Sequence, residues 1–275
     1  MGALDALDAI ADWPVTAAAA AVVGPSGVLA SHGDTGRVFE LASVTKPLVA
    51  RAAHIAIEEG VVELDTPAGP PGSTVRHLLA HASGLAMHSD RVLAKPGTRR
   101  MYSNHGFTVL AQTLEAESGI EFGRYLAEAV CDPLGMATTR LNGGAVAAGF
   151  GATSTVADLA AFAGDLLRPS TVSAQLHAQA TTVQFPGLDG VLPGYGVRRP
   201  NDWGLGFEIR DAKSPHWTGA RNSARTYGHF GQAGGFIWAD PEVELALVVL
   251  TDRDFGEWAL EPWPAICDAV ISEYS

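Results

Sequence analysis

The stretch LASVTKPLVARAAHIAIEEG, residues 41–60, is the most informative part of this sequence. Its apolar residues recur at helical spacing, which predicts a helix from about residue 43 to Glu59 that ends at Gly60. A proline in the first turns of that helix costs little, because the N–H it lacks would have no partner there. Ser43 and Lys46 are three residues apart, so both lie on one face of the predicted helix, one turn apart.

Ser43 and Lys46 form an S-x-x-K tetrad, and these two residue types can perform nucleophilic catalysis together. A serine hydroxyl is a weak nucleophile until a neighbour takes its proton. A lysine can be that base only if its surroundings lower its pKa from about 10.4 toward neutrality. The helix N-terminus adds free N–H groups that favour an oxyanion near Ser43. The tetrad alone is weak evidence, since a serine that only caps a helix gives the same pattern.

A second polar motif, Tyr102-Ser103-Asn104, lies in a loop before a predicted helix. A buried tyrosine near a lysine can share a proton and act as acid or base. The Asn104 amide offers both a donor and an acceptor to a substrate. The plain alternative is a loop in which Asn104 caps the helix that follows.

A third motif, His229-Phe230-Gly231, ends a predicted strand just before Gln232. Glycine at a strand end lets a substrate approach the backbone closely. The plain alternative is a strand end before a turn.

The segments around these motifs predict an α+β fold. Apolar alternation near both chain ends predicts strands, and helical periodicity dominates the middle. We therefore expect a mainly antiparallel sheet flanked by N- and C-terminal helices, with an inserted helical lobe and the active site between the lobes. The expected strands are 16–23, 28–31, 203–209, 226–230, 234–238 and 245–250, and the expected further helices are 4–12, 74–80, 105–118, 122–130 and 156–167, with a closing helix after Pro264.

One catalytic domain, residues 1–275, is expected to contain both lobes. Residues 1–62 and 200–275 are predicted to form the sheet lobe, and residues 63–199 the mostly helical lobe. Residues 186–200 show no periodicity, so they are expected to form a long loop that either covers the cleft or lies on the surface.

Composition narrows the range of partners and locations. The 275-residue chain has a formal net charge of −12 and no Lys/Arg run, which argues against binding nucleic acid or anionic lipid. Its acidic first residues lack the positive region of a secretory signal, and no apolar run is long enough to span a bilayer. We expect a cytoplasmic protein without membrane insertion, unless a leader was removed before residue 1. Cys131 and Cys267 suggest two reduced thiols, although a disulfide between them stays open.

Taken together, these motifs resemble the serine β-lactamase and penicillin-binding protein superfamily. The closest pattern is its class C β-lactamase-like branch, which includes esterases and D-amino acid peptidases. The likeness extends to VRHLLAHASGL, to PGTRRMYSNHGF, to WGLGFEI and to GHFGQAGGFIWADPEVELALVVLTDR, in the family's order over most of residues 15–255. No G-x-S-x-G motif is present, which argues against an α/β-hydrolase.

The resemblance implies a role for each motif residue. Ser43 is expected to be the acylated nucleophile, Lys46 its base partner and Tyr102 the second acid/base group. The oxyanion hole is expected to consist of the backbone N–H groups of Ser43 and Gln232. The residues expected to bind substrate are Asn104, His229, Gly231 and Gln232. No metal and no cofactor is implied; His77 and His81 are four apart but lack a third ligand.

The third motif departs from the family pattern, since many relatives that process β-lactams have Lys-Thr-Gly where this chain has His229-Phe230-Gly231. A permanent cation and a hydroxyl suit a substrate carboxylate, whereas a largely neutral histidine and a phenylalanine do not. We therefore expect a serine hydrolase that hydrolyses small carboxylic esters. A β-lactamase or D-amino acid peptidase/amidase of the same family, and a non-catalytic binding module on this fold, remain alternatives.

Overall fold

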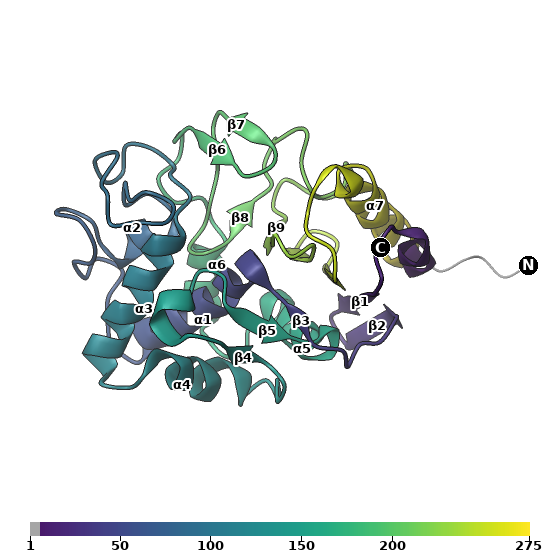
Figure 1. The fold of residues 1–275 in the computed structure, drawn as a ribbon, viewed down its shortest axis with the longest axis horizontal. Coiled ribbons are helices and arrows are strands. Elements are labelled where there is room, and N and C mark those ends of the chain that lie inside the picture. Colours follow the sequence, from purple (N-terminus) through teal and green to yellow (C-terminus); the bar gives the residue numbers. More distant parts are fainter. Residues whose placement is uncertain (1–5) are drawn as a thin grey trace, which may run out of the picture.

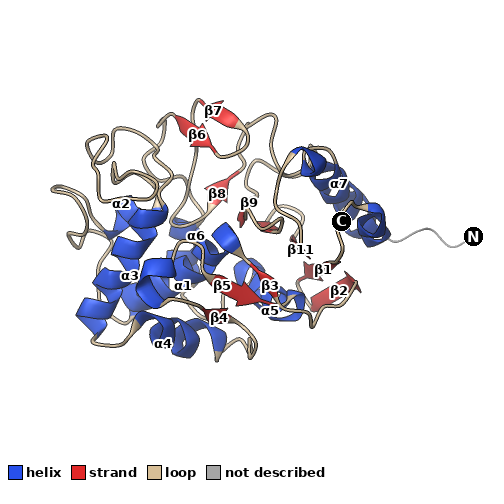
Figure 2. Cartoon of the chain, in the orientation of Figure 1, coloured by secondary structure: helices blue, strands red, loops and turns tan. Residues whose placement is uncertain are grey.

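The computed structural model describes residues 6–275, and its main layer is one antiparallel sheet (Figures 1 and 2). The strand order is β2-β1-β11-β10-β9-β8, and every neighbouring pair is antiparallel. The sheet therefore joins strands from both ends of the chain. Its strands are β1 (Ala18–Gly24), β2 (Gly27–His32), β8 (Glu208–Ile209), β9 (Tyr227–Phe230), β10 (Phe236–Asp240) and β11 (Leu245–Thr251).

Different helices cover the two faces of this sheet. Successive residues of a strand point to opposite faces, so neighbouring residues contact different helices. Ala20 of β1 lies in an apolar cluster with residues of α7 (Pro262–Tyr274) and of the 3-10 helix η1 (Ala6–Asp12). Its neighbour Ala21 lies in the other apolar cluster, which includes residues of α5 (Val156–Leu167). Each face thus has its own core, and the central strands are buried on both sides.

The helical part of the molecule is built around α1 (Thr45–Glu58), whose residues are buried from Thr45 to Ala56. A helix that is buried on all sides belongs to the core, so it gives a rigid base to the residues at its N-terminus. It packs against α3, α4 and the end of β9. The helices around it are α2 (Val75–Leu79), α3 (Asn104–Ser118), α4 (Phe122–Leu126) and the π-helical turn η3 (Ala127–Cys131).

Short elements connect these two parts. A small sheet has the order β3-β5-β4, and β6 and β7 form a separate two-stranded hairpin. Their bounds, with those of the other short elements, are β3 (Phe39–Glu40), η2 (Ala42–Val44), β4 (Arg140–Leu141), η4 (Gly144–Ala147), β5 (Ala152–Ser154), α6 (Ala174–Ala180), β6 (Gly190–Leu192), β7 (Gly196–Arg198) and η5 (Glu257–Ala259).

The predicted α+β class and antiparallel sheet are confirmed, with differences in detail. The predicted helix 4–12 is a 3-10 helix from Ala6 to Asp12, and Leu4 lies outside the described residues. Helix α5 falls in the segment expected for the helical lobe, yet it packs against β1, β10 and β11. The proposed division into lobes stays a prediction.

Two local expectations were wrong. Of the strand predicted over 203–209, only Glu208–Ile209 pairs as β8, since the preceding Gly204-Leu205-Gly206 segment turns. Residues 186–200 are not all loop, because they contain the hairpin β6–β7. Cys131 and Cys267 are both buried and unpaired.

Candidate active site

Ser43 lies in the 3-10 turn η2, directly before α1. Ala42, just before it, has a φ of 43°, a left-handed conformation that non-glycine residues rarely adopt. Such backbone strain persists only where the surrounding structure imposes it, and it clusters at functional sites. The turn holds the Ser43 side chain at the N-terminal end of the buried helix, where it is partly exposed.

Gly231 allows the end of β9 to pass close beside this turn. A Cβ atom at Gly231 would lie 2.3 Å from the Leu41 carbonyl oxygen and 3.3 Å from the Ser43 backbone nitrogen. A side chain there would force the two segments apart. The glycine was predicted to admit a substrate to the backbone; the contact that requires it is with residues 41–43 of the protein itself.

Lys46 is fully buried and its Nζ atom has three close polar neighbours. It lies 2.6 Å from Asn104 Oδ1, 2.6 Å from the Gly149 carbonyl oxygen and 3.2 Å from Ser43 Oγ. Burial lowers the pKa of Lys46 well below its usual value. A neutral amine has two N–H bonds and one lone pair, so the two close acceptors take the N–H groups and the lone pair faces Ser43. This is the arrangement of a general base.

Tyr102 contacts the same serine. Its hydroxyl donates a hydrogen bond to Ser43 Oγ at 2.7 Å, and its ring centroid lies 4.5 Å from Lys46 Nζ. Burial raises the pKa of Tyr102 above its usual value, so the phenol keeps its proton. Lys46 is therefore suited to accept a proton and Tyr102 to donate one.

His229 is buried beside Tyr102, with its Nε2 atom 3.4 Å from the Tyr102 hydroxyl. Its Nδ1 atom lies 2.6 Å from the Phe230 carbonyl oxygen, so Nδ1 carries the proton and Nε2 is an acceptor. Burial lowers the pKa of His229 to about 3. The imidazole is thus neutral and offers no positive charge to a substrate.

Two backbone N–H groups are available where an oxyanion would form. Within residues 6–275, neither the Ser43 nor the Gln232 backbone nitrogen donates a hydrogen bond to a protein acceptor. The Gln232 carbonyl accepts from Phe255, which fixes the orientation of this segment. These are the two groups predicted for the oxyanion hole.

Asn104 differs from its predicted role in one respect. It begins α3, while the hydroxyl of Ser103, and not Asn104, caps the helix by accepting from the Gly106 N–H. The side-chain carbonyl oxygen of Asn104 accepts a hydrogen bond from Lys46, which leaves the NH2 group as the free donor of this side chain. Asn104 therefore sets the orientation of the lysine as well.

His81 was set aside in the sequence as structural, but it supports the Tyr102 loop directly. Its carbonyl accepts from Met101 and its Nδ1 atom accepts from Ser103, so it fixes the peptides on both sides of Tyr102. Its ring packs against the Tyr102 ring, with centroids 4.6 Å apart. Gly149, the second acceptor for Lys46, was also missed. Neither contact has a local sequence signal, because both partners come from distant loops.

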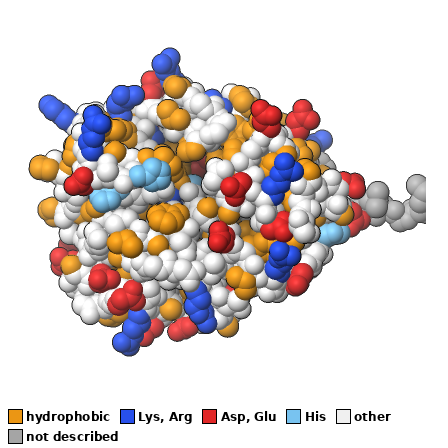
Figure 3. Space-filling view, in the orientation of Figure 1, with side chains coloured by type: hydrophobic (Ala, Val, Ile, Leu, Met, Phe, Trp, Pro, Cys, Tyr) orange, Lys and Arg blue, Asp and Glu red, His pale blue; other side chains and the backbone are white. Residues whose placement is uncertain are grey.

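A small pocket of about 70 Å³ opens at these groups. Ser43, Tyr102, His229 and Gln232 line it together with Met87, Leu192, Pro193, Trp203, Glu208 and Phe230. Figure 3 shows the hollow between the region of β6 and β8 and that of β5, with hydrophobic side chains along its edges. The carboxylate of Glu208 is neutralised by Lys213 at 3.0 Å and accepts from Trp217 at 2.6 Å. The pocket is therefore largely apolar and carries no free charge.

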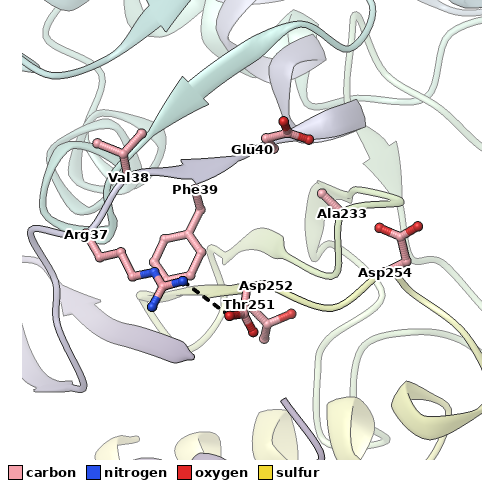
Figure 4. Close-up of a pocket in the computed structure, with 8 residues that line it drawn as sticks. All are labelled: Arg37, Val38, Phe39, Glu40, Ala233, Thr251, Asp252 and Asp254. Atoms are coloured by element: carbon pink, nitrogen blue, oxygen red, sulfur yellow. Dashed lines mark hydrogen bonds and ion pairs between the residues drawn. The ribbon is translucent and has the colours of Figure 1, made fainter. Parts of the chain in front are cut away.

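A separate pocket lies beside β3 and the end of β11 (Figure 4). Its Asp252 carboxylate forms an ion pair with Arg37 at 3.2 Å and accepts from the backbone of Thr16 and Ala17. It has no nucleophile beside a base, so the chemistry belongs to the pocket at Ser43.

Residues 6–275 contain no helix with both the length and the apolar character needed to cross a bilayer. The same residues contain no group of three or more side chains placed to hold a metal ion.

Comparisons with known proteins agree with this geometry. A family model described as Beta-lactamase matches residues 15–266. A crystal structure of a beta-lactamase from Mycobacterium bovis is 80% identical, with a TM-score of 0.97 over 98% of this chain and 99% of that chain.

More distant relatives share parts of the chain or its fold. Penicillin-binding protein 4* of Bacillus subtilis is 30% identical over 140 residues, which cover 39% of this chain and only 31% of that protein. EstCE1, described as a hydrolase with promiscuous acyltransferase activity, is 18% identical, with a TM-score of 0.80 over 97% of this chain and 96% of that chain. The last likeness is one of fold alone.

Proposed function

The chain belongs to the beta-lactamase family of serine hydrolases, and we propose that it hydrolyses small carboxylic esters through an acyl-enzyme on Ser43. The observation that carries this proposal is the position of Ser43 Oγ, 3.2 Å from the buried Lys46 amine and 2.7 Å from the Tyr102 hydroxyl. A base and an acid thus flank one nucleophile.

The geometry supports a two-step reaction. Ser43 Oγ attacks the ester carbonyl carbon and its proton passes to the Lys46 lone pair. The backbone N–H groups of Ser43 and Gln232 stabilise the tetrahedral oxyanion. When the C–O bond to the alcohol breaks, Tyr102 protonates the leaving oxygen and the Lys46 ammonium restores the Tyr102 proton. Water then attacks the acyl-enzyme with the same pair moving its proton, which releases the acid and free Ser43.

The neutral pocket favours an ester over an anionic β-lactam. His229 is uncharged and Phe230 presents no hydroxyl, so no group in this motif matches the carboxylate of a β-lactam. The relative from Mycobacterium bovis is described as a beta-lactamase, and this specific observation keeps β-lactam hydrolysis as the second candidate.

Turnover of three substrate classes tests the proposal. We expect kcat/KM for p-nitrophenyl acetate to exceed that for nitrocefin and for a D-alanyl dipeptide, and Ser43→Ala to abolish ester turnover. Faster turnover of nitrocefin would favour the β-lactamase alternative, and faster turnover of the peptide would favour the peptidase. Full esterase activity in Ser43→Ala would end the proposal, and no turnover at all by folded protein would support a binding module.

We propose a cytoplasmic location as well. Its support is that Cys131 and Cys267 are buried free thiols, which suit a reducing compartment. Fractionation of cells that express the full chain tests this, and recovery outside the cytoplasm would contradict it.

A further inference from the structure

A second, larger cavity continues from the active-site pocket past Tyr102. It measures about 410 Å³ and shares Met87, Tyr102 and Pro193 with the pocket at Ser43. Cavities of this size are typical of sites that bind small organic molecules. Because the two cavities share these three lining residues, a molecule held at Ser43 can extend from one into the other.

The lining of this second cavity is strongly apolar. Met87 and Leu93 come from the loop before α3, and Val191 comes from the β6–β7 hairpin. Their side chains are 42%, 48% and 55% exposed, which is unusual for large apolar residues gathered in one hollow. The lining also contains two arginines: Arg100 is buried and donates to the carbonyls of Ala80 and Asn201, whereas Arg99 is exposed to solvent.

Tyr102 decides which part of a substrate lies in this cavity. Its hydroxyl is suited to protonate the leaving oxygen, so that oxygen must lie within hydrogen-bond reach of it. The chain attached to the leaving oxygen then begins at Tyr102, which is also where the second cavity begins. The acyl group is left to the smaller pocket lined by Trp203 and Phe230.

From this juxtaposition we propose that the enzyme acts on esters of a short acid with a long apolar alcohol, whose alkyl chain occupies the cavity lined by Met87, Leu93, Met101, Val191 and Pro193. The inference rests on the proposed ester hydrolysis and adds the leaving group to it. The reaction is ordinary hydrolysis: the ester C–O bond breaks, water supplies the new acid oxygen, and the alcohol leaves with a proton.

Two ester series test the proposal, with acid release followed at constant pH. In the alkyl acetates from ethyl to octyl, kcat/KM is expected to rise about two- to fourfold for each added methylene, because each buries apolar surface. In the p-nitrophenyl esters from acetate to octanoate, where only the acyl chain grows, no such rise is expected. A rise in the acyl series with none in the alcohol series would overturn the proposal.

Variants of residues in the lining test whether the alkyl chain of the alcohol occupies this cavity. Val191→Asp and Leu93→Asp place a charge in the lining and are expected to lower kcat/KM for octyl acetate at least about tenfold more than kcat/KM for ethyl acetate. Val28→Asp is the matched control, since Val28 is 56% exposed on β2, away from the lining. Equal octyl acetate turnover in all three variants would overturn the proposal.

Labelling of Ser43 with a fluorophosphonate distinguishes a failure of the cavity assignment from a failure of the proposed ester hydrolysis. If Ser43 reacts with a fluorophosphonate and ethyl acetate is hydrolysed, but alcohol length has no effect, only the cavity assignment fails. If folded protein neither labels nor hydrolyses any ester, the proposed function fails with it.

Discussion

At the scale of single residues, the site depends on which of two groups carries a proton. Lys46 has two acceptors at 2.6 Å and no carboxylate among its close polar neighbours, so a buried ammonium would have no counter-charge there. Tyr102 keeps its proton because burial raises its pKa. The base and acid roles therefore follow from the surroundings of the two side chains and not from their types alone.

The decline of kcat/KM toward acid pH should reflect the protonation of Lys46. Because burial lowers its pKa, the base becomes active as pH rises through a value below the usual 10.5. His229 has a pKa of about 3 and is already neutral over that range. We expect kcat/KM for p-nitrophenyl acetate to fall toward acid pH, with a midpoint that His229→Asn does not move.

Lys46→Arg keeps a permanent cation at this position, so kcat/KM for p-nitrophenyl acetate should fall at least about a hundredfold at every pH. A limb near pH 6.5 that disappears in His229→Asn would contradict this assignment.

Gly231→Ala should damage catalysis more than folding. The added Cβ would lie 2.3 Å from the Leu41 carbonyl, so β9 and the Ser43 turn must move apart. Small displacements of oxyanion donors cost about a hundredfold in rate. We expect kcat for ester hydrolysis to fall by about that factor while the circular dichroism spectrum stays the same. Gly164→Ala in α5, where a Cβ meets nothing within 4 Å, is the control, and equal activity of the two variants would refute the prediction.

The residue scale also shows what sequence can predict about this site. Ser43, Lys46 and Tyr102 were predicted to act together because their spacing and order match a known chemical pattern, and in the structure the Lys46 and Tyr102 side chains lie within hydrogen-bond reach of Ser43 Oγ. The second acceptor for Lys46, the Gly149 carbonyl, and the support of Tyr102 by His81 have no such pattern. A backbone carbonyl leaves no mark in residue type, so only tertiary structure reveals it.

At the scale of elements, a buried ion pair joins the nucleophile helix to α5. Arg51 Nε lies 3.1 Å from Asp165 Oδ2, and both side chains are fully buried. Burial alone would raise the pKa of Asp165, but Arg51 and the hydrogen bonds from Ser170 and Thr171 outweigh it and lower that pKa. The carboxylate therefore stabilises the fold above its unfolded pKa of about 3.9, and this contribution is lost as pH falls toward the lower folded value.

Removing one partner of this pair should cost more than removing both. Asp165→Ala leaves the Arg51 cation buried without its partner, and we expect the free energy of unfolding to fall by about 3–5 kcal/mol at pH 7. Arg51→Met combined with Asp165→Asn should lose less than Asp165→Ala alone. Urea unfolding at pH 7 measures both. A double variant less stable than Asp165→Ala would show that the pair contributes net stability and would contradict this account.

Element prediction succeeded where local signals were strong. Helix α5 spans Val156–Leu167 as predicted, because its periodic apolar residues follow a Thr155 side-chain cap. The strand predicted at 203–209 was wrong because Gly206 has a φ of 89° and turns the chain where α1 passes close by. The β6–β7 hairpin was missed because its strands have only three residues each and their sequences show no alternation of apolar and polar residues.

At the scale of the whole molecule, the formal net charge of −12 should act on charged substrates. Long-range repulsion of anions weakens as salt shortens the screening length, whereas a neutral ester is not affected. We expect kcat/KM for nitrocefin, which carries a carboxylate, to rise between about 0.01 M and about 0.15 M salt. The value for p-nitrophenyl acetate should stay constant. A fall with salt for nitrocefin would point instead to a cationic anchor in the pocket.

At this scale we propose that the fold presents Ser43 as an activated serine at the N-terminal end of the buried helix α1. Intact-mass spectrometry after exposure to a fluorophosphonate, followed by peptide mapping, tests whether Ser43 is activated. We expect one adduct per chain, located on Ser43, and none in Ser43→Ala. A folded protein that takes up no adduct, or that carries it on another serine, would contradict the claim.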